Sequence, residues 1–420
     1  MSQEYFIQNL LKLKDPNIEF QSVKTDENSV FIIAKLAPSC SKCRYCGKSG
    51  LLRNGTKVVN IRIPNINERN AILKLRKQRY LCPKCHHTVI AQTPLVRPHH
   101  QISERTRHAI MIALTEDRNV TSIAQQFNVS PVSVNRIIDE LGPQIKSRPD
   151  DLPKVLCFDE FRSTQRQMSF IALNGETHEL VTLLPGRRNQ EIIQYFTRHY
   201  SLKNRQTVQY VVIDFNAQYQ SAIRQLFPKA KIVADNFHLV QMTLQALNQT
   251  RVQLMKKYPH TSKAYRLLKH NWRLYLMNYN RLEQRKPQWF AHLRDHLTQE
   301  QLVWEGLSLN DKFENTYFVA HQLTNALRQR KYDEFCAALT QSKAVSPQLM
   351  STIKTFKKYQ KLIENMMNCP KLSNGPLEGI NRKIKQIKRT AYGYRNWSRF
   401  NLRIRIELKI KVNKKKIIRK

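Results

Sequence analysis

The sequence is short of acidic residues and contains no long run of apolar ones. Aspartate and glutamate together number 31 against 71 lysines and arginines, which gives a formal net charge of +40 over 420 residues. No apolar segment approaches the roughly 20 residues that a helix needs to span a bilayer. The N-terminal segment MSQEYFIQNLLKLKD lacks the charge order and apolar core of a secretion signal. We therefore expect a cytoplasmic protein with no membrane partner.

The excess of positive charge is spread along the chain and is not confined to a tail. Surfaces rich in lysine and arginine bind polyanions because neutralising phosphates releases counterions. Hydrophobic residues make up 41% of the sequence, which allows packed cores, and the length suits about three domains. These features exclude a single small module and predict a multidomain protein that works among nucleic acids.

Eight cysteines in a chain expected to be cytoplasmic indicate metal binding more than disulfide bonds. Four of them form two Cys-x-x-Cys pairs: Cys43 with Cys46, and Cys82 with Cys85. Two such pairs bring four thiolates around one zinc ion, and the strand-rich segment between them suits a ribbon. The interval between the pairs is longer than usual, so alternative ligands remain: Cys40, His86 and His87. We predict a structural zinc in a domain over residues 1–100.

The apolar period becomes helical in residues 101–145. Ser103 and Ser130 each precede a helical run as capping residues do, and Pro131 suits the first turn of the last helix. Apolar residues recur at the spacing of a helix-turn-helix core. The last helix would present three side chains to base edges or phosphates: Ser133, Asn135 and Arg136. We predict a DNA-binding helix-turn-helix domain, with a three-helix core that binds no DNA as the alternative.

Short apolar runs alternate with turn residues from residue 153 to residue 238. Five strands are expected: 155–158, 169–173, 180–184, 208–213 and 231–234. Asn174-Gly175 is typical of a hairpin turn between the second and third strands, and a helical segment precedes each of the last two. Three antiparallel strands followed by two helical crossovers form one mixed sheet. This order matches a ribonuclease H-like α/β core.

Three aspartates follow these strands in a chain otherwise short of acids: Asp159, Asp214 and Asp235. Ligand sites of α/β sheets lie beyond the carboxyl ends of the strands, so acids at these positions would converge. Mg²⁺ prefers hard oxygen ligands, and two ions roughly 3.5 to 4 Å apart can stabilise both oxygens of a phosphoryl displacement. One such aspartate often marks only a strand's end. Three in one sheet predict a metal site, which one further carboxylate on a helix would complete.

The most basic amphipathic helix in the chain begins near Pro376 with a single carboxylate, Glu378, in its first turn. Three cations lie on the same face at helical spacing and would contact phosphates: Arg382, Lys385 and Arg389. A glutamate in the first turn commonly stabilises the helix end, and that interpretation suffices for this segment alone. Partner carboxylates elsewhere in the fold favour the second interpretation, in which Glu378 is a metal ligand.

Four segments together resemble the DDE transposases of bacterial insertion sequences: CFDEF, VVIDFNAQY, PKAKIVADNFHLV and SNGPLEGINRKIKQIKRTAYGYRN. The resemblance is to the ISL-three family in particular, covers nearly the whole chain and is most specific in the last segment. It implies a zinc-binding segment and a helix-turn-helix ahead of a ribonuclease H-like catalytic core. It also implies that Asp159, Asp214 and Glu378 are the catalytic acids and coordinate two Mg²⁺ or Mn²⁺ ions.

The second acid has two candidates, Asp214 and Asp235. We prefer Asp214, since the strand after the first crossover carries the second acid in ribonuclease H-like folds. Asp235 and His238 instead match an Asp/Cys-x-x-His pair that follows the next strand in related transposases, and we expect a structural role for them. A helix cap beside a satisfied histidine is the alternative for this pair.

The expected fold class is multidomain α+β, with the catalytic core interrupted by a helical insertion. The core comprises residues 153–238 and 373–410, the insertion spans 239–372, and a basic tail follows over 411–420. Three tryptophans of the insertion are expected in its apolar core: Trp272, Trp289 and Trp304.

The resemblance implies a transposase that binds the terminal inverted repeats of its element as double-stranded DNA. It would hydrolyse the phosphodiester at the element's ends and transfer the freed 3′-OH to target DNA. Synapsis of two ends implies at least a homodimer. Two alternatives remain: a DNA-binding regulator whose central domain only oligomerises, and a ribonuclease H-like nuclease that never joins strands. The regulator would have no need of three convergent acids.

Overall fold

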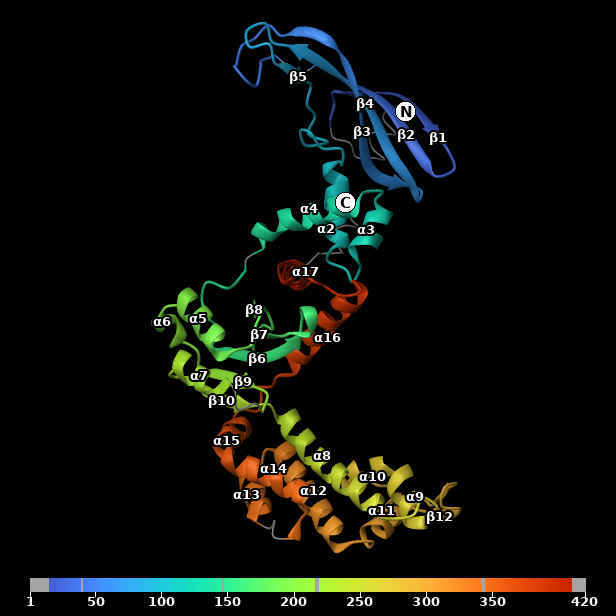
Figure 1. Ribbon diagram of the computed structural model, residues 1–420, viewed down its shortest axis with the longest axis vertical. Helices are drawn as coiled ribbons and strands as arrows, with labels where there is room; N and C mark the ends of the chain where they lie inside the picture. Colours follow the sequence, from blue (N-terminus) through green and yellow to red (C-terminus); the bar gives the residue numbers. More distant parts are fainter. Residues whose placement is uncertain (1–14, 39–40, 146, 216–218, 341–343, 410–420) are drawn as a thin grey trace. The chain divides into compact units, whose positions relative to one another are not determined.

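The computed structural model describes residues 15–38, 41–145, 147–215, 219–340 and 344–409 (Figure 1). The chain divides into two compact units. Unit 1 consists of residues 1–147 and 383–420, and unit 2 of residues 148–382. Cys40 and the expected tail over 411–420 lie outside the described residues. Within the described residues, no helix is long and apolar enough to cross a membrane.

Unit 1 begins with a sheet in the order β1-β2-β4-β3, and β5 pairs with β4. The strands are β1 (Ile18–Thr25), β2 (Ser29–Leu36), β3 (Leu52–Ile66), β4 (Arg69–Leu81) and β5 (Thr88–Ile90). Strands β3 and β4 form the long antiparallel ribbon visible in Figure 1. Ala71, Leu73 and Leu75 of β4 are buried while the residues between them are not, the alternation of a sheet with one covered face. The ribbon carries one cysteine pair just before it and one just after it.

Three helices follow: α2 (Glu104–Ala113), α3 (Val120–Gln126) and α4 (Pro131–Leu141). The predicted caps are present, since Ser103 Oγ accepts from Thr106 N at 3.1 Å and Ser130 Oγ from Ser133 N at 3.2 Å. The C-terminal helix α17 (Trp397–Lys409) adds the fully buried Ile406 to the same core. The helix-turn-helix is therefore confirmed, with a fourth helix from the far end of the sequence packed on it.

Unit 2 contains a five-stranded sheet in the order β10-β9-β6-β7-β8. Its strands are β6 (Val155–Arg162), β7 (Met168–Asn174), β8 (Leu180–Leu184), β9 (Tyr210–Ile213) and β10 (Lys231–Ala234). β6, β9 and β10 are parallel, whereas β7 is antiparallel to β6 and to β8. The predicted mixed sheet is confirmed. The predicted end of β6 at Phe158 is wrong, because pairing with β7 continues as far as Arg162.

The helices beside this sheet are α5 (Asn189–His199), α6 (Leu202–Arg205) and α7 (Gln220–Leu226). Phe158 lies at the centre of the aromatic core under them, with ring centroids 4.8 Å from Phe170, 5.8 Å from Phe196 and 6.2 Å from Phe227. Such a ring is held from several sides. The strand is therefore fixed immediately before Asp159.

The insertion is helical and leaves the sheet directly after β10. Its helices are α8 (Asn236–Met255), α9 (Lys263–His270), α10 (Trp272–Leu276), α11 (Gln299–Leu307), α12 (Asp311–Gln329), α13 (Tyr332–Thr340), α14 (Pro347–Lys358) and α15 (Gln360–Asn368). A small hairpin, β11 (Gln288–Phe290) with β12 (Asp295–Leu297), interrupts them. The long α8 packs on α12 and α14. The chain then enters α16 (Gly375–Thr390).

The three tryptophans of the insertion are exposed, so the expectation that they lie in its core is wrong. Their places are taken by fully buried residues such as Tyr275, Phe313 and Tyr317. These aromatic and aliphatic side chains fill the space between the helices, which leaves the larger indoles at the surface.

Candidate active site and metal centre

The three aspartates lie in one row across neighbouring strands. Parallel pairing places Phe158 of β6 beside Ile213 of β9, and Ile213 beside Ala234 of β10. Each aspartate is the next residue of its strand or follows that strand directly. Asp159, Asp214 and Asp235 therefore meet at one edge of the sheet, although Asp159 lies within β6 and the other two lie beyond β9 and β10.

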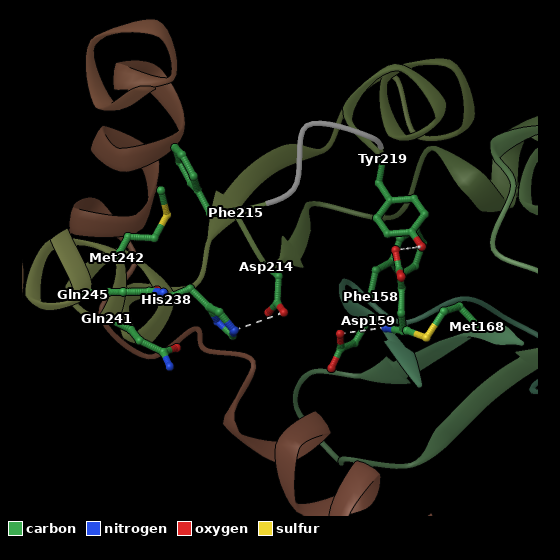
Figure 2. Close-up of a pocket in the computed structure, with 11 residues that line it drawn as sticks. Phe158, Asp159, Met168, Asp214, Phe215, Tyr219, His238, Gln241, Met242 and Gln245 are labelled. Atoms are coloured by element: carbon green, nitrogen blue, oxygen red, sulfur yellow. Dashed lines mark hydrogen bonds and ion pairs between the residues drawn. The ribbon is translucent and has the colours of Figure 1, made fainter. Parts of the chain in front are cut away.

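His238, in the first turn of α8, joins two of these aspartates. Its Nδ1 lies 3.0 Å from Oδ2 of Asp235. Its Nε2 lies 3.2 Å from Oδ2 of Asp214 (Figure 2). The hydrogen bond to Asp235 and the charge of Asp214 raise the pKa of His238, although burial opposes them. Asp235 is buried and caps no backbone N–H of α8. Asp235 occupies the N-cap position of α8, but its carboxylate bonds to His238 in place of a backbone N–H of the helix.

Two asparagines of the segment around Glu378, which we did not predict as site residues, hold the other oxygens of the acids. Asn374 Nδ2 donates to Asp214 Oδ1 at 3.0 Å, and its backbone N–H donates to Asp235 Oδ1 at 3.2 Å. Asn381 Nδ2 donates to Asp159 Oδ2 at 2.6 Å. Both asparagines are buried. The start of α16 is thereby tied to all three aspartates.

Glu378 lies between these asparagines, four residues after Asn374 and three before Asn381, so the three share one helix face. The structure does not bring its carboxylate into contact with the aspartates. The side chain is 54% exposed, pairs with Arg382 Nη2 at 2.5 Å and does not line the cavity in front of the aspartates. Glu378 is thus on the face of α16 that meets the acids, with its carboxylate turned to Arg382.

A cavity of about 550 Å³ opens in front of Asp159 and Asp214, with His238 on its wall (Figure 2). Burial, and next the neighbouring Asp214, raise the pKa of Asp159 to about 7. Burial also raises the pKa of Asp214. Two carboxylates forced together away from water disfavour a second negative charge, and a divalent cation between them would remove that penalty. The oxygen donors of this site therefore fit Mg²⁺ or Mn²⁺.

Glu160 and Glu407 are further carboxylates near the predicted acids in sequence, and both already have partners. Glu160 accepts from the Tyr219 hydroxyl at 2.7 Å and pairs with Arg187. Glu407, in unit 1, is buried and pairs with Arg403 at 2.9 Å. Glu160 is thereby held away from a ligand role, even though it lines the cavity.

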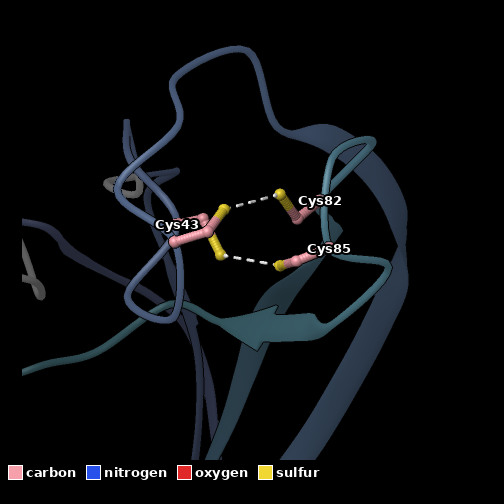
Figure 3. Close-up of side chains that lie close together, drawn as sticks. Cys43, Cys82 and Cys85 are labelled. Carbon is pink, nitrogen blue, oxygen red and sulfur yellow. Dashed lines mark hydrogen bonds between the residues drawn. The ribbon is translucent and has the colours of Figure 1, made fainter.

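The four predicted cysteines of unit 1 gather into one cluster (Figure 3). Sulfur atoms of Cys43 and Cys85 are 3.6 Å apart, and those of Cys46 and Cys82 are 3.5 Å apart. A tetrahedron with Zn–S bonds of about 2.3 Å has edges of about 3.8 Å, so the cluster has the size of a zinc site. His87 is engaged elsewhere, with Nδ1 2.9 Å from the carbonyl of Cys85 and its ring stacked on Tyr45. Four thiolates leave no open position, which indicates a structural zinc.

The predicted DNA-binding side chains lie on two helices. On α4, Arg136 is exposed and Asn135 is half-buried, while Ser133 Oγ bonds with Ser130 Oγ at 3.0 Å. On α16 the three cations are exposed: Arg382, Lys385 and Arg389. Both helices therefore present cations to solvent, as phosphate contacts require.

Three family models match the chain. The ISL3 model described as a transposase covers residues 156–404, which is more than half of the sequence and includes all the candidate acids. A model described as the helix-turn-helix domain of transposase family ISL3 covers residues 91–142. A third, described as the zinc-finger of transposase IS204/IS1001/IS1096/IS1165, covers residues 40–85.

Individual proteins similar to this chain cover different shares of it. The chain is 24% identical to the transposase for insertion sequence element IS1001 of Bordetella parapertussis, over 86% of this chain and 87% of the relative. It is 32% identical to a Lactococcus lactis subsp. lactis protein named an ATP-dependent protease, over 29% of this chain and 39% of that protein. Among solved structures, the Drosophila P element transposase strand transfer complex aligns with a TM-score of 0.31 and 11% identity, over 74% of this chain and 92% of that chain.

We expect zinc removal to loosen the cysteine end of the ribbon of unit 1, because a zinc ion bound by all four thiolates would hold the two knuckles together. Cys82→Ser should lower the bound zinc from about one ion per chain to well below half of that. Zinc content by atomic emission and β-structure by circular dichroism measure the effect. Cys369→Ser, in unit 2, is the matched control and should keep its zinc. Full zinc content in Cys82→Ser would contradict the assignment.

We also expect the stability of unit 2 to depend on pH through Asp159. Its pKa is raised from 3.8 to about 7 in the folded protein, so its favourable contribution is complete below pH 3.8 and is lost as pH rises through 7. Without added Mg²⁺ or Mn²⁺, the free energy of unfolding of Asp159→Asn should rise relative to wild type as pH increases. Between pH 4 and pH 8 this difference should grow by about 2 to 4 kcal/mol. Urea unfolding at several pH values measures this gain. The exposed Asp333→Asn should show none, and a gain for Asp159→Asn that does not vary with pH would refute the expectation.

Proposed function

This chain belongs to the ISL3 family of insertion-sequence transposases. From this membership we propose a function for each of its domains. The helix-turn-helix binds the terminal inverted repeats of the element. The sheet and α16 then cut DNA at the element's ends and join the freed 3′-OH to target DNA. Asp159, Asp214 and Glu378 are the metal ligands in this proposal.

The observation that carries the proposal is the attachment of α16 to the strand acids. Asn374 and Asn381 bond to Asp214 and Asp159, and Glu378 occupies the helical turn between them. A helix that served only as a scaffold would not need two buried amides on two carboxylates. This arrangement supports a site to which two strands and one helix each contribute one acid.

Held by these acids, two Mg²⁺ or Mn²⁺ ions would activate the attacking hydroxyl and stabilise the leaving oxygen of the phosphodiester. The chain's own residues hold that geometry. Asn381 fixes one oxygen of Asp159, and His238 fixes one oxygen of Asp214. Glu378 must exchange Arg382 for the ions. That exposed ion pair is worth only about 0 to 1 kcal/mol, so its loss opposes the exchange little.

DNA binding divides between the two cationic helices in this proposal. Arg136 and Asn135 of α4 contact the terminal repeat, while Arg382, Lys385 and Arg389 of α16 contact phosphates near the cut. A homodimer would hold two element ends in one synaptic complex. The zinc site keeps the long ribbon of unit 1 folded for this task.

Two other functions differ from this one in what they require. A DNA-binding regulator would use the helix-turn-helix to bind DNA and the central domain only to oligomerise, so it would have no need of the row of acids in unit 2. A ribonuclease H-like nuclease would use the same acids but would never join strands. Strand joining therefore separates the transposase from the nuclease, and metal-dependent cutting separates both from the regulator.

We expect Asp159→Asn and Glu378→Gln each to slow metal-dependent nicking of labelled DNA carrying the element's end by at least roughly 100-fold. Each change removes one charged ligand without changing side-chain size. Gel analysis of nicked and joined products, with a second duplex as target, measures both steps. The exposed Glu176→Gln is the control and should behave as wild type. Nicking that survives either variant would sink the assignment of that acid, and cutting without joining would identify a nuclease.

Asn381→Ala should weaken the site without removing a ligand. Losing a partner that orients a metal ligand costs roughly 10- to 100-fold in metal affinity, so half-maximal nicking should need correspondingly more Mg²⁺. Calorimetric titration of Mn²⁺ into the DNA-free protein gives a readout that does not depend on cutting. Gln386→Ala, an exposed amide on the same helix, serves as the control. An unchanged Mn²⁺ affinity in Asn381→Ala would show that the asparagine only packs the helix.

A further inference from the structure

A second cavity, of about 670 Å³, lies along α8 beside the one that holds the acids. Phe237, Val240 and Leu244 of α8 and Leu276 of α10 form its apolar wall. Gln241 and Gln245 line this cavity and the cavity of the acids. The two hollows are therefore adjacent, and one row of amides borders both.

Phe237 is the feature of this cavity that packing does not explain. It is 60% exposed, more than any other phenylalanine that the structure describes, and it stands between Asp235 and His238 in the chain. Among the described residues its ring contacts that of His238, with the two ring planes nearly perpendicular and 5.7 Å between centroids. The ring continues the apolar wall formed by Val240 and Leu244, and a contiguous apolar surface in a cavity with a few polar groups is typical of a ligand site.

Polar side chains complete the lining of the cavity. Gln241, Gln245 and Asn248 of α8 contribute amides, and Arg328 of α12 contributes a cation. The cavity therefore offers a flat aromatic face beside amides that can both donate and accept hydrogen bonds.

We propose that this cavity binds an unpaired nucleotide of the element's DNA, next to the phosphodiester that is cut. The base stacks on Phe237, and its edge bonds to Gln241 and Gln245. Every base has a π-face, and amides both donate and accept hydrogen bonds, so the cavity can bind different bases. Arg328, at the same cavity, provides a cation for the backbone of that nucleotide.

The position of the cavity identifies the occupant. The scissile phosphate must lie at the acids. The next nucleotide of the same strand must then lie no more than the length of one nucleotide away. The cavity shares two amides with the acid site and has no carboxylate on its wall to repel a phosphate. This inference rests on the proposed function, because it takes the acids as the place of cutting.

The test compares two substitutions that keep an apolar side chain at position 237. Phe237→Trp keeps an aromatic face, whereas Phe237→Leu keeps only hydrophobic bulk. We expect Phe237→Leu to slow nicking by roughly 5- to 150-fold, the usual range for losing one base–aromatic stack. Phe237→Trp should stay near wild type. Phe318→Leu, an exposed phenylalanine of α12 that lines neither cavity, is the matched control and should not change the rate.

A second measurement detects the base directly. A 2-aminopurine placed at successive positions on either side of the cut brightens where it leaves the duplex stack. In the Asp159→Asn background, which keeps the DNA whole, one position should brighten on binding, and Phe237→Leu should abolish that signal. An abasic nucleotide at the same position should slow wild type and leave Phe237→Leu no slower than before.

Three outcomes would overturn the inference. Nicking by Phe237→Leu at the wild-type rate would remove the need for the ring, and equal defects in Phe237→Leu and Phe237→Trp would exclude stacking. A change of oligomeric state in Phe237→Leu on gel filtration would assign the cavity to a second copy of the chain. If the wild-type protein never nicks DNA, the proposed function fails. The fluorescence increase of 2-aminopurine in uncut DNA then still tests whether the cavity binds a nucleotide.

Discussion

The arrangement of unit 2 depends on holding Asp159 and Asp214 at one edge of the sheet, partly shielded from water at the wall of one cavity. The parallel register of β6 and β9 forces them into one row, and the aromatic packing of Phe158 prevents β6 from moving away. Burial and mutual repulsion raise the pKa of Asp159, which shows that this closeness opposes stability. This destabilisation is offset because each of the three carboxylates accepts at least one hydrogen bond. If this pair of carboxylates had no function, mutation would readily remove it, since replacing a shielded charge with a neutral group is often stabilising.

The donors come from the two segments that continue the sheet at either end of the insertion. His238 lies in the first turn of α8, Asn374 directly precedes α16, and Asn381 lies two turns into α16. The insertion therefore starts and ends at the acids, and its folding aligns the groups that hold them. Glu378 is the exception, because it is on the right face but pairs with Arg382. A carboxylate kept at the surface in a weak ion pair adds no repulsion to the row until a cation is present to receive it.

Much of this arrangement could be predicted from the sequence because it follows from local patterns. Alternating apolar runs predicted the strands, capping serines predicted the helix-turn-helix, and paired cysteines predicted the zinc cluster. Asn374 and Asn381 were missed because an amide in a basic helix has no local signature, and its partners lie more than a hundred residues away. The same limit applies to Ile406, which packs in a core formed by residues near the other end of the chain. The exposed tryptophans show the converse, since hydrophobicity alone does not say which side of a helix faces the core.

The first turn of α8 joins the two inferences about unit 2. Successive residues of a helix point about 100° apart, so the neighbours Phe237 and His238 cannot face the same way. With His238 fixed to Asp214 and Asp235, the ring of Phe237 contacts the His238 ring and lines the cavity along the helix. One turn later, Gln241 borders both hollows. The contact that orients an acid for catalysis therefore also sets where the adjoining aromatic ring stands. A nucleotide seated on Phe237 would be positioned by the same hydrogen bonds that position Asp214.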